Sequence, residues 1–301
     1  MAVQIKKVAP DTYLLDCGKD PFFSLSSIAY FLDDEMPVLI DPGSGTAAAE
    51  LFDGVGQAGI DLQRLSYIIP THIHLDHGGG AGYLAQRLPN TRVVLHPRGA
   101  THLIDTTVLV RGARLIFGQD FEQSLGPVVP IPKERVHVAS DGEVIRLGKR
   151  ELKVIFSPGH AVHHIALFDS LTEGLFCGDA LGFLAEGMSE IPFPVGLSPF
   201  DPRSYVETID KLAALHPKVV FYAHHGPRTE VDQLIGKVKE ICLAFDDIIH
   251  KGIAAGEDDQ QISQHILDYS SGLAQQADLP VFARVGISGY IQYYRNHRNG
   301  R

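Results

Sequence analysis

Four residues able to bind a metal ion fall within six positions of the segment Thr71-His72-Ile73-His74-Leu75-Asp76-His77-Gly78-Gly79-Gly80. The segment directly follows the apolar run 66–69, which is typical of a β-strand. In an extended chain His72 and His74 point to the same side, because side chains alternate between the two faces. Asp76 and His77 would then begin a helix, and the glycines behind them permit a sharp turn. One short segment is therefore expected to bind two metal ions side by side.

Three further groups of polar residues follow predicted strands. The residues Ser157-Pro158-Gly159-His160 come after the run 152–156, and Cys177-Gly178-Asp179-Ala180 ends the run 175–177. The third group, Ala223-His224-His225-Gly226-Pro227, follows the run 219–222. Side chains on loops after rigid strands suit a preorganised metal site. We therefore expect all three loops to contribute ligands.

Strand and helix signals alternate in two blocks along the chain. Strands are predicted at 13–15, 27–32, 37–40, 66–69 and 92–95, and again at 136–138, 144–147, 152–156, 165–168, 175–177 and 219–222. Helices are predicted at 47–58, 83–88, 110–125 and 202–215, and from 230 onward with a break near 256–261. The pattern predicts an α/β fold, a sandwich of sheets flanked by helices, with a helical C-terminal extension.

Composition excludes several classes of function. The 301 residues carry 26 basic and 36 acidic side chains, a net charge of −10 that argues against nucleic-acid or membrane partners. Three scattered cysteines, Cys17, Cys177 and Cys242, do not make a disulfide framework or a cysteine-only metal site. The N-terminal sequence does not match a signal peptide, and no apolar run is long enough to span a membrane. We expect a cytoplasmic protein that acts on a small molecule.

The motif HxHxDH with its glycines, followed in order by PGH, GD and HG, resembles the metallo-β-lactamase fold superfamily, particularly its glyoxalase II-like hydrolases. The resemblance extends over about residues 12–228. It implies an αββα sandwich, with a catalytic domain at 1–228 and a helical extension at 229–301.

The resemblance also implies a ligand set. It assigns His72, His74 and His160 to one metal, Asp76, His77 and His225 to a second, and Asp179 to a bridging position. His225 is favoured over the adjacent His224 only by its His-Gly-Pro context. Two residues are expected to support the ligands rather than bind metal: Asp41, which would orient a histidine, and His164.

Nitrogen and oxygen ligands of this kind suit two divalent ions, zinc above all, with iron or manganese also tolerated. Two such ions lower the pKa of a bridging water, and the resulting hydroxide attacks a carbonyl. Asp76 would position or shuttle a proton as the catalytic carboxylate. The expected reaction is hydrolysis of an ester, a thioester or a lactone.

Other chemistry is compatible with the same motif. Persulfide dioxygenases share the fold and motif but use one iron, so a mononuclear-iron persulfide dioxygenase is the alternative. A flavodiiron reductase is disfavoured, because that group typically has Glu at the second histidine and carries a flavin domain. A nuclease is disfavoured by the charge balance, and a non-catalytic metal-stabilised protein by the complete ligand set.

The substrate is left open by the sequence. The C-terminal lysines Lys237, Lys239 and Lys251 show no pattern that matches the glutathione-binding residues of glyoxalase II. Lactonases often place a tyrosine three residues after the bridging Asp, where this chain has Gly182 followed by Phe183. The segments 183–200 and 108–121 are expected to form walls or a lid, or equally to be core. The apolar stripe at 281–294 is compatible with a homodimer and equally with docking onto its own domain.

Overall fold

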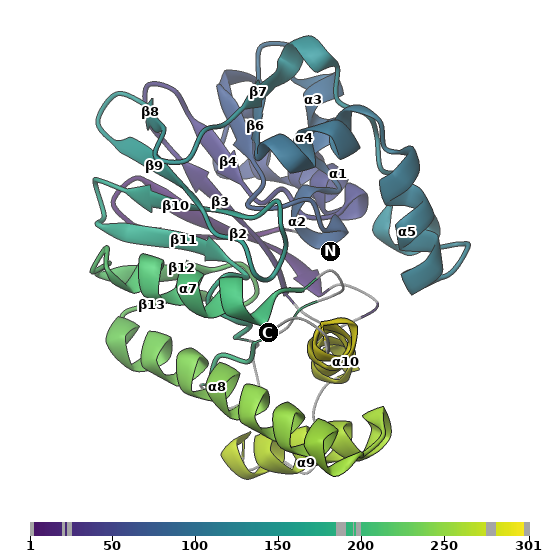
Figure 1. Ribbon diagram of the computed structural model, residues 1–301. Helices are drawn as coiled ribbons and strands as arrows, with labels where there is room; N and C mark the ends of the chain where they lie inside the picture. The colour runs from purple at the N-terminus through teal and green to yellow at the C-terminus, as the bar shows by residue number, and fades with distance from the viewer. Residues whose placement is uncertain are drawn as a thin grey trace.

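The computed structural model describes residues 3–19, 22, 26–184, 191–194, 196, 200–274 and 281–297. Two β-sheets stack face to face, and helices cover the outer face of each (Figure 1). The predicted αββα sandwich is confirmed. The first sheet has the order β1 (Gln4–Ala9), β2 (Thr12–Lys19), β3 (Ser26–Leu32), β4 (Val38–Ile40), β5 (Tyr67–Ile69), β6 (Arg92–Leu95) and β7 (Val136–Val138). The second has the order β13 (Gly226–Arg228), β12 (Val219–Tyr222), β11 (Gly174–Gly178), β10 (Ile165–Asp169), β9 (Glu151–Phe156) and β8 (Val144–Arg146).

Apolar residues form one layer between the sheets and one on each outer face. Ile40 and Ile69 of the first sheet share the central layer with Phe176 and Phe221 of the second. The outer face of the first sheet is covered by α1 (Gly45–Gly54), α3 (Ala81–Arg87) and α4 (Pro97–Ile104). The outer face of the second is covered by α7 (Pro202–Ala213) and α8 (Val231–Ala255). Removing these apolar side chains from water at about 25 cal/mol per Å² is the main force that holds the layers together.

Strand directions bring the candidate loops to one edge of the sandwich. Strands β4 and β5 are parallel, so the residues that follow them, Asp41 and Thr71, lie at the same end of the first sheet. Strand β10 pairs antiparallel with both β9 and β11, and β11 is parallel to β12. The segments that follow β9, β11 and β12 therefore all leave the same end of the second sheet. The motif helix α2 (Leu75–Gly78) follows β5 at this edge.

The C-terminal helices are α8, α9 (Asp259–Ala274) and α10 (Val281–Asn296). The predicted helix at 281–294 docks onto its own chain, because Ile287, Tyr290, Ile291 and Tyr294 are buried in the same core as α7 and α8. These four side chains are therefore not exposed for a dimer. None of the helices that the structure describes has the length and apolarity needed to cross a membrane.

One strand is missing from the prediction, one predicted helix is divided in two, and one predicted loop lies mostly outside the described residues. The edge strand β1 is absent from the prediction, because Gln4, Lys6 and Lys7 make it polar. The helix expected at 110–125 is two helices, α5 (Thr107–Phe117) and α6 (Glu122–Leu125), separated at Gly118, whose φ of +92° ends α5. Of the loop expected at 183–200, only residues 183, 184, 191–194, 196 and 200 are among those described.

Candidate metal centre

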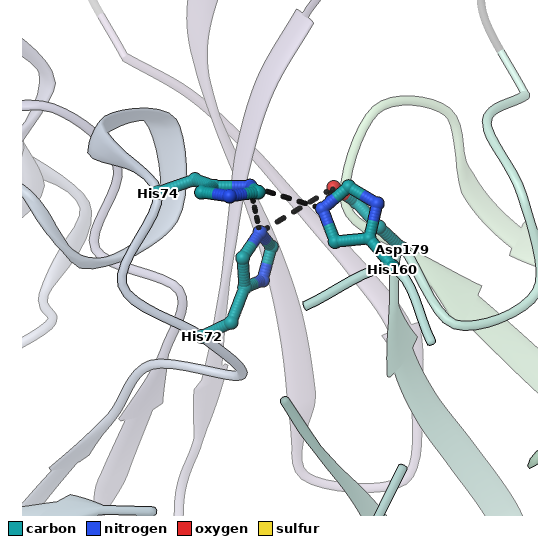
Figure 2. Close-up of side chains that lie close together, drawn as sticks. All are labelled: His72, His74, His160 and Asp179. Atoms are coloured by element: carbon teal, nitrogen blue, oxygen red, sulfur yellow. Dashed lines mark hydrogen bonds and ion pairs between the residues drawn. The ribbon is translucent and has the colours of Figure 1, made fainter. Parts of the chain in front are cut away.

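Four buried or half-buried side chains from three loops meet at the edge of the sandwich: His72, His74, His160 and Asp179 (Figure 2). His74 Nδ1 lies 2.9 Å from His72 Nε2 and 3.0 Å from His160 Nε2. Asp179 Oδ2 lies 3.5 Å from His72 Nε2 and 3.2 Å from His160 Nε2. We call these four residues the first group.

The spacing of the first group fits a tetrahedral metal ion. Ligands about 2.0–2.1 Å from zinc stand about 3.3 Å from one another, close to the separations of 2.9–3.5 Å given above. The donors are also of the right kind, since three imidazole nitrogens and a carboxylate oxygen suit zinc and related divalent ions. The residues present therefore fit the divalent ion that the sequence motif implies.

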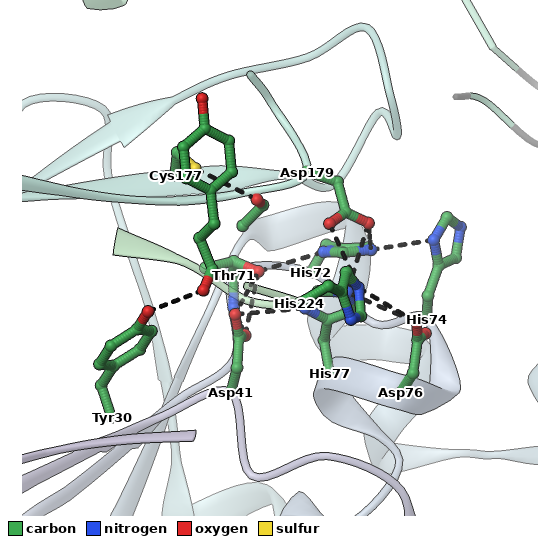
Figure 3. Close-up of polar contacts among 12 residues, drawn as sticks. Tyr30, Asp41, Thr71, His72, His74, Asp76, His77, Cys177, Asp179 and His224 are labelled. Carbon is green, nitrogen blue, oxygen red and sulfur yellow. Dashed lines mark hydrogen bonds and ion pairs between the residues drawn. The ribbon is translucent and has the colours of Figure 1, made fainter. Parts of the chain in front are cut away.

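A second group consists of Asp76, His77 and His224 (Figure 3). Asp76 Oδ2 lies 3.6 Å from His77 Nε2 and 3.6 Å from His224 Nε2. The two histidines are buried, whereas the Asp76 side chain is 26% exposed. Solvent therefore reaches the carboxylate of this group.

The Asp179 carboxylate stands between the two groups. Its Oδ2 atom contacts His160 of the first group at 3.2 Å and His77 of the second at 3.3 Å. Its Oδ1 atom lies 3.6 Å from His224 Nε2. One buried carboxylate is thus within reach of donors from both groups.

Hydrogen bonds behind the first group orient the ring of His72. The Thr71 hydroxyl donates its single proton to Asp41, at 3.0 Å from Oδ1, so it accepts from His72 Nδ1 at 3.1 Å. The Thr71 backbone N–H also donates to Asp41 Oδ1, at 2.7 Å. This chain fixes the tautomer of His72 and leaves the lone pair of Nε2 facing the centre.

The histidines of the second group are oriented by one ion-pair contact and one hydrogen bond. His77 Nδ1 lies 3.2 Å from Asp41 Oδ2, and His224 Nδ1 donates to the Ser26 carbonyl oxygen at 2.8 Å. In both rings the Nε2 atom therefore faces Asp179. Asp41 supports both groups, the first through Thr71 and the second directly, which is the role expected for it behind the site.

His164 lies behind Asp179. Its Nε2 accepts a hydrogen bond from the Asp179 backbone N–H at 3.2 Å, and its Nδ1 lies 2.7 Å from the Ser157 hydroxyl. Gly178 permits this contact, because a Cβ there would come within 2.7 Å of His164 Nε2 and 2.5 Å of Thr71 Oγ1. The structure therefore places His164 in support of Asp179.

Burial and neighbouring charges set the protonation of the site. Burial, together with the surrounding histidines, lowers the pKa of His72 and of His74 well below its usual value, so both rings are neutral at pH 7. Burial alone would also lower the pKa of His77, but the carboxylates of Asp179, Asp76 and Asp41 raise it well above its usual value. Burial opposes ionisation of Asp179, yet His77 and His160 lower the pKa of that carboxyl far below its usual range.

Three atoms that face the centre are buried without a hydrogen bond in the part of the chain that the structure describes: His77 Nε2, Asp179 Oδ1 and His224 Nε2. Burying a polar atom without a partner costs about 1–3 kcal/mol. Three such atoms at one point indicate that a further group completes their coordination. Bound metal ions would provide a partner for all three atoms.

One ligand expected from the sequence is placed elsewhere. The structure brings His224, and not His225, into the second group. The His-Gly-Pro context does not decide between the two residues. The hydrogen bond from His224 to Ser26 of β3 decides between them, because it turns the His224 ring toward Asp179. The other six expected ligands lie in the two groups: His72, His74, Asp76, His77, His160 and Asp179.

The two segments expected to form walls or a lid, 183–200 and 108–121, both contribute residues near the site or the motif helix. Phe183 is buried, and the centroid of its ring lies 5.0 Å from that of His224 and 6.2 Å from that of His160. In the segment 108–121, Ala113 and Phe121 pack in one cluster with Leu75 of the motif helix. These residues are core, which is one of the two roles expected for these segments.

The lysines considered for glutathione binding each pair with an acidic residue of this chain. Lys237 bonds Glu240, Lys239 bonds Asp210 and Lys251 bonds Asp247.

Comparison with known proteins identifies relatives. The family model described as the metallo-beta-lactamase superfamily matches residues 23–224. The chain is 25% identical over 215 residues to the metallo-beta-lactamase fold-containing protein of Sulfurisphaera tokodaii, which is 70% of this chain and 77% of that protein. It is 23% identical over 258 residues (82% of this chain) to the atrochrysone carboxyl ACP thioesterase of Aspergillus fumigatus. It is 28% identical over 198 residues (64% of this chain) to a hydroxyacylglutathione hydrolase of Aliivibrio fischeri. These matches span 65% and 58%, respectively, of the lengths of the last two relatives.

A solved structure shows the same fold along nearly the whole chain. A metallo-beta-lactamase family protein of Thermus thermophilus superposes with a TM-score of 0.71 at 22% identity, over 97% of this chain and 95% of that one. The likeness therefore includes C-terminal helices as well as the sandwich.

Proposed function

The chain belongs to the metallo-beta-lactamase superfamily, and from this premise we propose that it is a dinuclear metal-dependent hydrolase of small acyl thioesters. The observation that carries the proposal is the position of Asp179, whose carboxylate reaches histidines of both groups. A carboxylate shared in this way is what a bridging ligand between two ions requires. We propose zinc as the metal, because the donors are imidazole nitrogens and carboxylate oxygens.

The choice of thioesters is supported by the names of two relatives. One is a thioesterase that acts on an acyl carrier protein, and the other hydrolyses hydroxyacylglutathione, itself a thioester. Because the two names share only the thioester bond, we propose the bond and not either carrier as the feature that this chain recognises.

The residues of the chain divide the work of hydrolysis. Divalent ions, when bound, lower the pKa of a water molecule and polarise a thioester carbonyl. One ion would be held by the three histidines of the first group, His72, His74 and His160. The other would be held by the second group, Asp76, His77 and His224. Asp179 would be a ligand of both. Asp76 is also the partly exposed carboxylate of the site, so its Oδ atoms would accept the proton of the attacking water and pass it to solvent or to the leaving thiolate.

The test uses the purified full chain loaded with zinc. Hydrolysis is measured for a thioester, an oxygen ester and a lactone that carry comparable acyl groups. We expect the thioester to be cleaved fastest, and His72→Ala and Asp179→Asn to lower kcat/KM by at least about 100-fold. The matched control His265→Ala removes a histidine whose side chain is 55% exposed, and should leave turnover unchanged. A zinc-loaded chain that cleaves none of the three substrates, or full activity in His72→Ala, would contradict the proposal.

A further inference from the structure

Helix α7 contacts two of the loops that carry the first group. Its Tyr205 hydroxyl donates to the Asp179 carbonyl oxygen at 2.9 Å, and its Thr208 hydroxyl donates to the Pro158 carbonyl oxygen at 2.6 Å. Pro158 lies two residues before His160. One helix thus holds the backbone of the shared carboxylate and the backbone of the loop before His160.

The fit between α7 and the second loop is close. Gly159 has a φ of +131°, and a Cβ at that position would lie 2.3 Å from the Tyr205 Cα. The backbone N–H of Asp201, the N-cap of α7, donates to the Gly159 carbonyl oxygen at 3.0 Å. The helix therefore cannot shift without moving this loop.

Tyr205 is suited to act as a permanent donor. Its side chain is fully buried, and burial raises the pKa of its phenol well above the usual value, so the hydroxyl keeps its proton. The Asp179 carbonyl also accepts from the Gly182 N–H at 3.2 Å, while the Asp179 N–H donates to His164. The backbone of Asp179 is thus held on both sides, which fixes the direction of its carboxylate.

We propose that α7 positions the metal centre: through Tyr205 and Thr208 it keeps the Asp179 carboxylate and the His160 imidazole in register. Both are positioning residues, since neither side chain reaches the donor atoms themselves. The 3.2 Å separation of Asp179 Oδ2 and His160 Nε2 is the distance that this helix maintains. The inference rests on the metal centre proposed above.

The test is a titration of the metal-free full chain with Co²⁺, followed by visible absorption and by metal analysis. Loss of a group that orients a ligand typically weakens metal affinity by about 10–100-fold. We expect Tyr205→Phe and Thr208→Val each to weaken Co²⁺ binding by about 10-fold or more and to change the absorption spectrum. Thr208→Ser, which keeps the hydroxyl, should restore both properties.

Tyr222→Phe is the matched control. The Tyr222 side chain is as deeply buried as that of Tyr205, but its hydroxyl has no hydrogen-bond partner among the residues that the structure describes. This control should bind Co²⁺ as the wild type does. An unchanged affinity and spectrum in both Tyr205→Phe and Thr208→Val would overturn the inference alone. If one of them does not fold, the other decides. A wild-type chain that binds no Co²⁺ would instead overturn the proposed centre, and the inference with it.

Discussion

The Nδ1 atom of His77 lies 3.2 Å from Oδ2 of Asp41, so that the opposite nitrogen of the ring faces Asp179. Asp41 has a φ of +50°, which is unusual for a residue other than glycine and costs about 1–3 kcal/mol. Its carboxylate also accepts the Thr71 N–H and hydroxyl. The strained backbone of Asp41 therefore carries a carboxylate that orients His77 directly and His72 through Thr71.

Replacing Asp41 with Asn should weaken metal binding more than it changes the fold. Asn keeps the shape of the side chain but removes the charge that orients His77, so we expect a loss of about 10–100-fold in zinc affinity, measured by competition with a chelating dye. The control is Asp34→Asn. Asp34 is also buried, but it lies 3.5 Å from Arg150 at the other end of β4. Equal zinc affinities in the two variants would contradict the role given to Asp41.

The two adjacent histidines after β12 should behave differently. His224→Ala removes a donor of the second group, so we expect it to lower the metal content toward one ion per chain and kcat/KM by about 100-fold or more. His225→Ala should keep both ions, because His225 is outside both groups. Metal analysis of the two variants, prepared in parallel, decides between them. If His225→Ala lost metal and His224→Ala did not, the ligand would be His225, as the His-Gly-Pro context in the sequence indicates.

Metal removal should lower the thermal stability of the chain. Without ions, His77 Nε2, Asp179 Oδ1 and His224 Nε2 are buried without hydrogen bonds in the described part of the structure. A ligand at 1,000 times its Kd stabilises a protein by about 4 kcal/mol, which for a chain of this size corresponds to about 6 °C in Tm. Differential scanning calorimetry with and without a chelator measures the difference. An unchanged Tm would mean that the two groups hold no ion.

The pH dependence of stability should reflect His163, which lies beside the site. Burial, with His160 and His96 nearby, lowers the pKa of His163 to about 3. The unfolded chain binds a proton at this residue below its ordinary pKa of about 6.5, whereas the folded chain does so only near 3. Stability is therefore fully present above pH 6.5 and falls between 6.5 and 3, by up to about 1.4 kcal/mol per pH unit for this residue.

Urea denaturation of the metal-free chain at pH 7 and pH 5 measures this effect. We expect His163→Asn to lose less stability between the two pH values than the wild type does. Exposed His265, replaced by Asn, is the control and should lose as much as the wild type. An equal loss in His163→Asn and in the wild type would show that the buried ring does not resist protonation.

Much of the fold follows from local patterns in the sequence. The spacing of His72, His74, Asp76 and His77 after an apolar strand is sufficient to predict a double metal site, because strand geometry and the glycine turn act locally. His160 and Asp179 can be predicted as site residues from their positions after apolar strands. Their strands, β9 and β11, both pair antiparallel with β10 and therefore end at the same edge of the sheet.

Other features depend on contacts that no local pattern shows. The choice of His224 over His225 depends on a hydrogen bond to Ser26, nearly two hundred residues away in the chain. Tyr205 has the sequence signature of an ordinary core residue on an amphipathic helix, and only its contact with Asp179 sets it apart. Strand β1 escapes prediction because an edge strand with exposed lysines lacks the apolar alternation on which prediction depends.

The most direct test of the dinuclear centre is the number of ions per chain, counted by native mass spectrometry and elemental analysis after loading with zinc. The position of Asp179 between the two groups predicts two ions per chain in the wild type. It predicts one or fewer in Asp179→Asn. One ion per chain in the wild type, unchanged in Asp179→Asn, would contradict the account; a single iron in the protein as isolated would point to the mononuclear oxygenase chemistry that the motif also allows.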